Sequence, residues 1–340
     1  MTKKIIRVLG IESSCDETSV SIVEKSGEKI RVLANIVKSQ IDIHQYYGGV
    51  VPELAARAHS DVIDKLIRLA MDKAKLSLKK IDAISATAGP GLMGGLLVGV
   101  VAGKTLAYVL KRPFIAINHL EGHALSIKLE SEIDYPYLLL LVSGGHTEFT
   151  VIKKFNSYKR IGTTIDDALG EAFDKTARLL KLGYPGGPEI EKYAKLGDKN
   201  KFNLPKPLIN EKNCHFSFAG LKSSVANIVA ENRCTEKFKK DMSASFQETI
   251  NQIIFVKSKN AIQEYKRTIK NKDKIKIVVA GGVAANQGIR NSLKKLEEIE
   301  NCEFLFPSIK YCTDNGAMIA IAGIERFERN KFNKLNFKPR

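Results

Sequence analysis

Cysteine is scarce in this sequence, and the few cysteines form no recognised pattern. There are five of them, an odd number, and no two stand in C-x-x-C spacing. A disulfide framework pairs an even set and a zinc ribbon needs closely spaced pairs, so we expect neither. The opening stretch "MTKKIIRVLGIESS" has no charged-then-apolar leader, so no secretory signal is expected either. These absences predict a cytoplasmic protein.

Long apolar runs are also lacking. The longest, "LMGGLLVGVVAG", ends where Lys104 interrupts it, whereas a helix that crosses a bilayer needs about 20 apolar residues. We therefore expect no membrane-spanning segment and no membrane partner.

Negative charge is in short supply, since 54 Lys and Arg face 37 Asp and Glu for a net charge of +17. Clustered cations neutralise phosphates and favour a polyanionic partner such as a nucleic acid. The cations are dense in residues 257–276 and 326–340, where we expect docking. A lysine-, asparagine- and isoleucine-rich compositional bias would produce the same total without a partner, and charge does not distinguish RNA from DNA.

The 340 residues leave room for two domains. Two segments, "IRVLGIESSCDETSVSIV" (6–23) and "YLLLLVSGGHTEFTVI" (137–152), each read as an apolar strand, a small polar turn and an alternating strand. Such turns can cradle phosphate oxygens, although plain hairpins would look the same. One hairpin per half resembles the internal duplication of the actin, sugar-kinase and heat-shock ATPase superfamily. We predict an α/β, two-lobed fold of duplicated RNase H-like domains with a ligand cleft between the lobes. Residues 1–135 would form one lobe and 136–340 the other, with the last helix free to pack back on the first.

Helical periodicity marks several further elements. Residues 53–74 carry apolar positions at helical spacing, and residues 81–110 read as a strand, a Gly-Pro-Gly turn and a helix with small residues on one face. "GKT" (103–105) is not a P-loop, because Val98 stands where that motif needs glycine. In the second half we predict a helix over 165–180, a turn over 183–190 and a strand, Gly-Gly turn and helix over 274–293 that could seat a nucleotide.

The stretch "INHLEGHALSI" (117–127) carries the clearest chemical signal. His119 and His123 are four residues apart, so on a helix they share one face and could share an ion. The metalloprotease motif H-E-x-x-H has glutamate directly after the first histidine, whereas Glu121 is two places on and would point away. A metal site and two satisfied polar side chains remain equally open on this pair alone. Farther on, Asp314 occupies a predicted N-cap position before a helix in 307–327, where capping alone is the simpler interpretation.

Taken together, the motifs resemble the TsaD family of tRNA N6-adenosine threonylcarbamoyltransferases from end to end. They occur in the family's order: "GIESSCDET", "GGVVPELAARAH", "GPGLMGGLLVG", "NHLEGH", "LLVSGGHT", "GEAFDKTARLL", "YPGGP", "FSFAGLKSS", "AGGVAANQ" and "YCTDNGAMIA". Archaeal and eukaryotic cytosolic relatives have a tyrosine just before "VSGG". Leu141 stands there and the neighbouring polar residue is His146, which indicates the bacterial and organellar branch.

The resemblance implies one divalent metal per subunit, between the lobes, with His119, His123 and Asp314 as ligands. Imidazole and carboxylate suit Fe²⁺ most and Zn²⁺ as well. Because no tyrosine is available at position 141, water, Ser143 or the substrate would complete the coordination. The implied substrate contacts are Leu141, Val142, Ser143, Gly144, Gly145, Asp174, Gly187 and Asn286, with Glu191 held more loosely. Asp16 and Glu17 are candidates for orienting adenine or steering a proton, although a solvated polar turn explains them nearly as well.

The resemblance also implies the reaction. The threonylcarbamoyl group would pass from threonylcarbamoyl-AMP, which supplies an ATP/AMP-type nucleotide moiety, to N6 of adenosine 37 in tRNAs that read codons beginning with A. The implied partners are tRNA, a paralogue (TsaB), a small ATPase (TsaE) and TsaC or a related enzyme that makes the adenylate. Three alternatives compete: a metal-dependent glycoprotein endopeptidase, a kinase of the sugar or acetate type, and a non-enzymatic ATP-binding scaffold on tRNA.

Overall fold

Two units make up the chain, each built around a five-stranded sheet. The computed structural model describes residues 5–270 and 273–340. The first unit runs to Ile133 and also takes in Pro307–Arg340, and the second is Asp134–Phe306. The predicted second lobe ran to residue 340, with the last helix free to pack back on the first lobe. The final helix, α11 (Gly316–Phe327), does pack on the first unit's sheet, and the first unit takes in all of residues 307–340.

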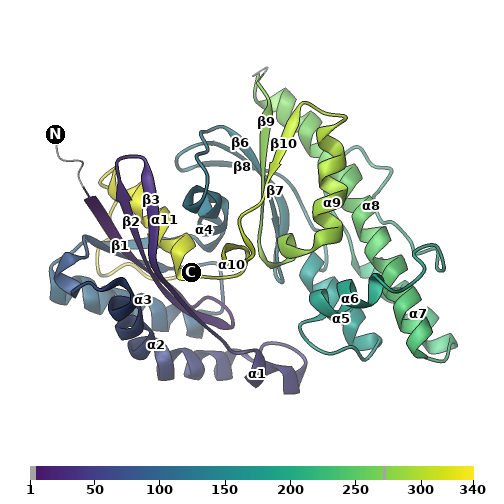
Figure 1. The fold of residues 1–340 in the computed structure, drawn as a ribbon, viewed down its shortest axis with the longest axis horizontal. Coiled ribbons are helices and arrows are strands. Elements are labelled where there is room, and N and C mark those ends of the chain that lie inside the picture. Colours follow the sequence, from purple (N-terminus) through teal and green to yellow (C-terminus); the bar gives the residue numbers. More distant parts are fainter. Residues whose placement is uncertain (1–4, 271–272) are drawn as a thin grey trace. The chain divides into compact units, whose positions relative to one another are not determined.

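The first unit is an α/β layer structure, drawn in purple and blue with its C-terminal part in yellow (Figure 1). Its strands are β1 (Ile5–Glu12), β2 (Glu17–Ser26), β3 (Lys29–Ser39), β4 (Ala83–Thr87) and β5 (Phe114–Ile117). Its helices are α1 (Ile41–His44), α2 (Pro52–Ala74), α3 (Met93–Leu110), α4 (His119–Leu125), α10 (Ile309–Cys312) and α11, with short 3-10 turns η1 (Gln45–Tyr47), η2 (Leu78–Lys80) and η3 (Ser126–Leu129).

The second unit repeats the plan with more helix. Its strands are β6 (Tyr137–Val142), β7 (Thr147–Lys154), β8 (Ser157–Thr163), β9 (Ile275–Ala280) and β10 (Cys302–Leu305). Its helices are α5 (Leu169–Leu179), α6 (Gly186–Ala194), α7 (Ala219–Glu231), α8 (Glu236–Thr268) and α9 (Gln287–Glu297), with a 3-10 turn η4 (Gly282–Ala285).

The two sheets have the same topology, which bears out the predicted duplication. The first sheet has the order β3-β2-β1-β4-β5 and the second β8-β7-β6-β9-β10. In each, three sequential strands pair antiparallel and two later strands add in parallel to the first. Both predicted hairpins are present, because β1–β2 and β6–β7 are joined by the short polar turns that the sequence indicated.

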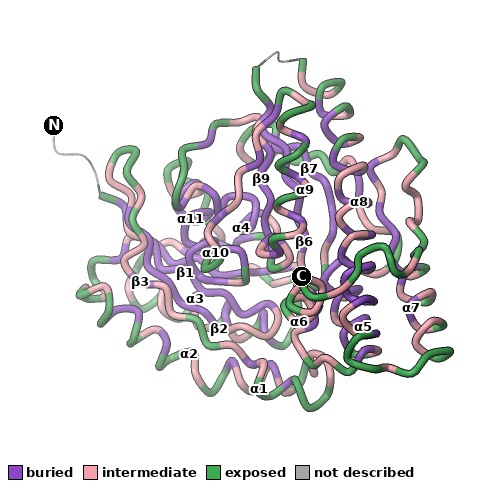
Figure 2. The backbone as a smooth tube through the Cα atoms, turned by 45° about the vertical axis from the view of Figure 1, so that its right-hand side comes forward, coloured by how far each residue is buried: buried purple, intermediate pink, exposed green. Residues whose placement is uncertain are grey.

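The core of the first unit lies between its sheet and helices α2 and α3, where both views place these helices along one face (Figures 1 and 2). The sequence pattern put Leu54, Ala58, Val62, Leu66 and Leu69 on the buried stripe of α2, but the buried residues are Ala55, His59, Ile63, Leu66, Ala70 and Met71. The stripe is rotated because His59 is a buried polar residue: Thr18 and Gln40 lie 2.8 and 3.2 Å from its Nδ1, and its Nε2 lies 3.1 Å from the Cys15 carbonyl.

The glycines that were predicted to share one face of α3 are packed against the sheet and the turn after β1. Gly95, Gly99 and Gly103 are all buried, and a Cβ at Gly95 would stand 2.3 Å from the Ser13 carbonyl oxygen. By length and composition alone α3 could cross a membrane, with 18 residues and a mean hydropathy of 1.7. The apolar run was predicted to be too short for a membrane span because Lys104 interrupts it. In the structure the helix continues past Lys104 to Leu110. A single helix of this kind is weak evidence for a membrane span, since core helices of soluble proteins can be equally long and apolar.

Four predicted boundaries shift. The predicted turn over 183–190 becomes helix from Gly186, the helix after β9 starts only at Gln287 behind the turn η4, and the last long helix starts at Gly316. Predicted helix 165–180 is present as α5 but begins at Leu169. Helix starts depend on local capping contacts.

Candidate active site

Helix α4 carries both histidines of "NHLEGH" at the carboxyl end of β5. The Asn118 side chain accepts hydrogen bonds from the Leu120 and Glu121 N–H groups at 2.9 and 3.3 Å, so it caps the helix. The helix then places His119 and His123 one turn apart, with ring centroids 4.7 Å from each other. Both side chains are buried.

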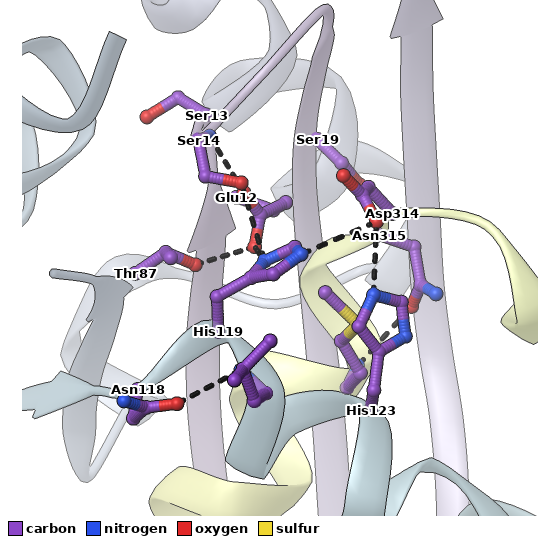
Figure 3. Close-up of polar contacts among 12 residues, drawn as sticks. Glu12, Ser13, Ser14, Ser19, Thr87, Asn118, His119, His123, Asp314 and Asn315 are labelled. Atoms are coloured by element: carbon purple, nitrogen blue, oxygen red, sulfur yellow. Dashed lines mark hydrogen bonds and ion pairs between the residues drawn. The ribbon is translucent and has the colours of Figure 1, made fainter. Parts of the chain in front are cut away.

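Asp314 faces this histidine pair from the loop before α11 (Figure 3). Its Oδ1 lies 3.0 Å from His123 Nε2 and 3.6 Å from His119 Nε2. The close packing of α4 on α11 makes this possible, since a Cβ at Gly122 would stand only 2.9 Å from Ile319 Cδ1. All three side chains belong to the first unit, because that unit includes residues 307–340.

Asp314 does not cap α11, which corrects the simpler interpretation. The N-cap is Asn315, whose side chain accepts hydrogen bonds from the Ala317 and Met318 N–H groups at 3.0 and 3.1 Å. The Asp314 carboxylate is therefore directed at the two imidazoles (Figure 3).

The three side chains fit a divalent metal. Their ligand atoms all lie within 4.8 Å of one another. Donors bound to one ion at about 2.0–2.1 Å stand roughly 3.0 Å apart at right angles and roughly 3.3 Å apart in a tetrahedron. The Oδ1–Nε2 separations of 3.0 and 3.6 Å bracket these values. Two imidazole nitrogens and one carboxylate oxygen are a common donor set for iron and zinc.

A buried glutamate that no sequence motif indicated lies behind His119 and sets the orientation of its ring. Glu12 Oε2 lies 3.2 Å from His119 Nδ1, while its two oxygens also accept hydrogen bonds from Thr87 Oγ1 and the Ser14 N–H at 2.5 and 2.6 Å. A carboxylate on Nδ1 keeps a proton on that nitrogen and directs Nε2 toward Asp314. A fully buried glutamate at the end of the apolar strand "IIRVLGIE" is the signal that could have revealed it.

Two carboxylates control the charge of His119. Burial alone would lower its pKa, but Asp314 and Glu12 outweigh that effect and raise the pKa to about 9. The chain therefore holds negative potential where a cation would sit, and a bound cation would replace the histidine proton.

The candidate residues Asp16 and Glu17 lie in and just after the β1–β2 turn. Burial, and then the neighbouring charges of Asp16 and Asp314, raise the pKa of Glu17 well above its usual range. The turn itself is anchored, because the Gln40 N–H donates to the Asp16 carbonyl at 3.0 Å. The structure thus places Glu17 where burial and the charges of Asp16 and Asp314 favour its neutral form, which differs from a solvated polar turn.

Glu121 points away from the histidines, as the sequence predicted. Its Oε2 accepts a hydrogen bond from Arg326 Nη2 of α11 at 2.7 Å, and its side chain is only 3% exposed. It is therefore engaged in a buried ion pair rather than placed as the general base of a metalloprotease.

In the second unit, the "VSGG" residues form an open turn after β6. Leu141 and Val142 are buried in the strand, Ser143 is half-buried, and Gly144 and Gly145 are exposed. The Ser143 N–H donates to the His146 carbonyl at 2.8 Å, so this group is already used within the turn. A Cβ at Gly144 or Gly145 would meet nothing within 4 Å, which leaves space for a ligand there.

The remaining predicted substrate residues hold the helices around this turn. Asp174 Oδ1 accepts a hydrogen bond from the Gly186 N–H at 2.7 Å and fixes the start of α6, where Gly187 borders open space. Asn286 is buried, caps α9 through the Ile289 N–H and donates to Gln247 Oε1. Glu191 accepts from the Gln287 N–H at 3.1 Å.

Solved structures with the same fold are distant in sequence. HypF from T. kodakarensis is 14% identical with a TM-score of 0.63, over 96% of this chain and 48% of that one. A full-length HypF in a phosphate- and nucleotide-bound form is 12% identical with a TM-score of 0.62, over 98% and 48% of the chains. The chain thus spans about half of each HypF, and the likeness supports the two-lobed, ATPase-like fold that the sequence predicted.

Sequence relatives are much closer. The family model described as TsaD, tRNA N6-adenosine threonylcarbamoyltransferase, matches residues 31–321. A protein of that name from Pelagibacter ubique is 54% identical, over all of this chain and 95% of the relative. Another from Rickettsia rickettsii is 48% identical, over 99% and 97% of the two chains. The chain therefore belongs to the TsaD family of transferases, the tRNA N6-adenosine threonylcarbamoyltransferases.

Proposed function

We propose that this transferase moves the threonylcarbamoyl group from threonylcarbamoyl-AMP to N6 of adenosine 37 in tRNAs that read codons beginning with A. The adenosine nitrogen would form a bond to the carbamoyl carbon, AMP would leave, and N6 would lose one proton. Because AMP is a good leaving group, the protein must chiefly position two reactants, exclude water and stabilise charge.

The observation that carries the proposal is the convergence of His119, His123 and Asp314 on one point. These residues would hold one divalent metal, Fe²⁺ first and Zn²⁺ second. Such a metal supplies Lewis-acid stabilisation of charge on the oxygens of the transferred group. Glu12 would keep His119 in the tautomer that a metal requires.

The remaining residues would act on the nucleotide and on protons. The N–H groups of Gly144 and Gly145 would bind phosphate or carboxylate oxygens in the open turn. Asp174, Glu191 and Asn286 would shape the rest of the site by fixing the starts of α6 and α9, with Gly187 leaving room for the nucleotide. Glu17, whose pKa burial and neighbouring carboxylates raise, would exchange a proton near the metal centre. We assign no general base.

An exposed apolar face on α3 supports a protein partner. Met93, Leu97 and Val101 recur every four residues with 46–57% of their surface exposed, and a contiguous apolar face on a helix favours association. We propose that the chain acts in the cytoplasm with its paralogue TsaB and the ATPase TsaE, on adenylate made by TsaC or a related enzyme.

Reconstitution tests the proposal. Purified protein with TsaB, TsaE, the adenylate-forming enzyme, ATP, threonine, bicarbonate and tRNA should yield threonylcarbamoyladenosine by mass spectrometry of the digested nucleosides. We expect repeated turnover from the mixture and little product from the chain alone. Absence of product from the full mixture would overturn the proposed reaction, and robust turnover by the isolated chain would overturn the partner requirement.

A further inference from the structure

Six exposed cations gather at one end of the first unit. We call this set the basic end, and it consists of Lys73, Lys75, Lys79, Lys80, Lys111 and Arg112. They come from two stretches, "KAKLSLKK" and "KR", that are 30 residues apart in the sequence. Neither stretch was among the dense basic segments that the sequence analysis singled out.

The fold brings the two stretches together. Helix α2 ends at Ala74 and α3 ends at Leu110, each followed by a left-handed lysine, Lys75 and Lys111. Arg112 Nη2 donates to the Lys79 carbonyl at 3.2 Å, which joins the stretch after α3 to the turn η2. The Ile84 N–H donates to the Pro113 carbonyl at 3.1 Å, where β4 and β5 begin side by side. The six side chains therefore share one edge of the unit.

The basic end combines closely spaced cations with a lack of acidic partners. Among the described residues of the first unit, the lysine and arginine ion pairs within 4.0 Å join other side chains, and the six residues of the basic end are in none of them. In the two segments predicted to dock a polyanion, several of the cations are already engaged by other groups of the chain. In residues 257–276, Lys257 is buried and donates to the Glu211 and Asn213 carbonyls, while Lys266, Arg267 and Lys274 pair with glutamates. Lys272 lies outside the described residues.

The C-terminal segment is also partly neutralised, since Arg326 pairs with Glu121 and Arg329 with Glu325. Two carboxylates stand near the basic end in sequence. Asp82 is half-buried and accepts the Arg7 N–H, and Asp72 is exposed. Within residues 72–82 and 110–113, six exposed cations thus accompany one exposed carboxylate.

Helix stability accounts for only part of this arrangement. Cations near helix C-termini are favoured by the helix dipole, and this explains the sign of Lys73, Lys75, Lys111 and Arg112. It does not explain Lys79 and Lys80, which lie on the turn between α2 and β4. The like charges of the basic end repel one another in the folded protein. An anionic partner would reduce this electrostatic repulsion.

We propose that the basic end binds the phosphodiester backbone of the tRNA substrate at a point remote from the adenosine that is modified. This inference rests on the proposed function. Strand β5 starts beside Arg112 and ends at the cap of α4, which carries His119. Its four residues alone span about 13 Å, so the basic end and the candidate metal centre lie at opposite ends of the strand. The basic end would therefore contribute binding energy without touching the reacting groups.

The test compares two variants with equal loss of charge in the reconstituted complex. The quadruple variant K73Q/K79Q/K80Q/K111Q removes four cations of the basic end and spares Arg112, whose hydrogen bond holds Lys79. The control K192Q/K199Q/K201Q/K237Q removes four exposed lysines of the second unit. For each, the affinity for a tRNA transcript is measured against salt, together with KM for tRNA, kcat, metal content and melting temperature.

For the basic-end variant we expect at least tenfold weaker tRNA binding near 0.1 M salt. The slope of log affinity against log salt should be about three units shallower, since each lost phosphate contact changes it by about 0.7–0.9. KM for tRNA should rise while kcat, metal content and melting temperature hold. Equal losses in both variants would show that net charge alone binds tRNA and would overturn the proposal.

A second arm measures binding to vesicles that contain phosphatidylserine, because exposed Tyr108 and Val109 adjoin the basic end. Loss of vesicle binding with tRNA affinity unchanged would also overturn the proposal and assign the surface to membranes. If the wild-type complex binds tRNA through the basic end but makes no threonylcarbamoyladenosine, the proposed function fails while this inference stands.

Discussion

Replacing Asp314 with asparagine separates metal binding from helix capping. The asparagine side chain has the same shape, so the loop before α11 should keep its course, and Asn315 should still accept the Ala317 and Met318 N–H groups. What is lost is the anion that stands 3.0 and 3.6 Å from the two imidazole nitrogens. Asp314 is the one anionic donor among the three candidate ligands. Its loss should weaken metal affinity at least about a hundredfold, which corresponds to about 2.7 kcal/mol of binding free energy.

Asn315→Ala is the matched control one residue away. It removes the acceptor of two buried N–H groups, so the free energy of unfolding should fall by about 1–2 kcal/mol. For a unit of this size, that lowers the melting temperature by about 2–8 °C. The three candidate ligands are untouched, so metal affinity and transfer rate should stay close to those of the wild type.

The assay combines elemental analysis after dialysis, metal titration, melting temperature without metal and the rate of transfer in the reconstituted mixture. Asp314→Asn should lose metal and slow transfer at least about a hundredfold while its metal-free melting temperature stays near the wild-type value. Asn315→Ala should keep its metal and its transfer rate but melt at a lower temperature than the wild type. If Asp314→Asn retains its metal and a near-normal rate, the three-ligand site is wrong.

Two further predictions concern residues around the site. Glu12→Gln should weaken metal affinity about 10–100-fold, because the amide no longer holds the Nδ1 proton of His119; metal titration checks this, and an unchanged affinity would remove Glu12 from the site. His59 should make the fold acid-sensitive: burial lowers its pKa below 6.5, so the unfolded chain takes up the proton first and stability falls as pH drops below about 6.5. Melting temperatures at pH 7.5 and 5.5 should therefore differ more for the wild type than for His59→Gln, and equal differences would exclude His59 as the cause.

Sequence alone determined the elements whose signals are local. Strand alternation and polar turns predicted both hairpins, and the spacing of the α3 glycines predicted a helix with small residues on one face. The i, i+4 spacing of His119 and His123 predicted a shared helical face, and the position of Glu121 predicted that it points elsewhere. The order of ten motifs also identified the family. Each of these features depends on neighbours within a few residues or on a whole-chain pattern.

Tertiary structure decided what depends on residues far apart in the chain. Asp314 reads as a helix cap from its neighbours alone, and only the packing of α4 on α11 directs it at the histidines. Glu12 is 107 residues from His119, and the apolar strand around it gives no indication of that contact. The buried stripe of α2 was misplaced for a related reason, since His59 is buried only because Thr18, Gln40 and Cys15 satisfy its ring nitrogens. Burying a polar or charged group is favourable only when distant partners pair with it, and local sequence does not contain those partners.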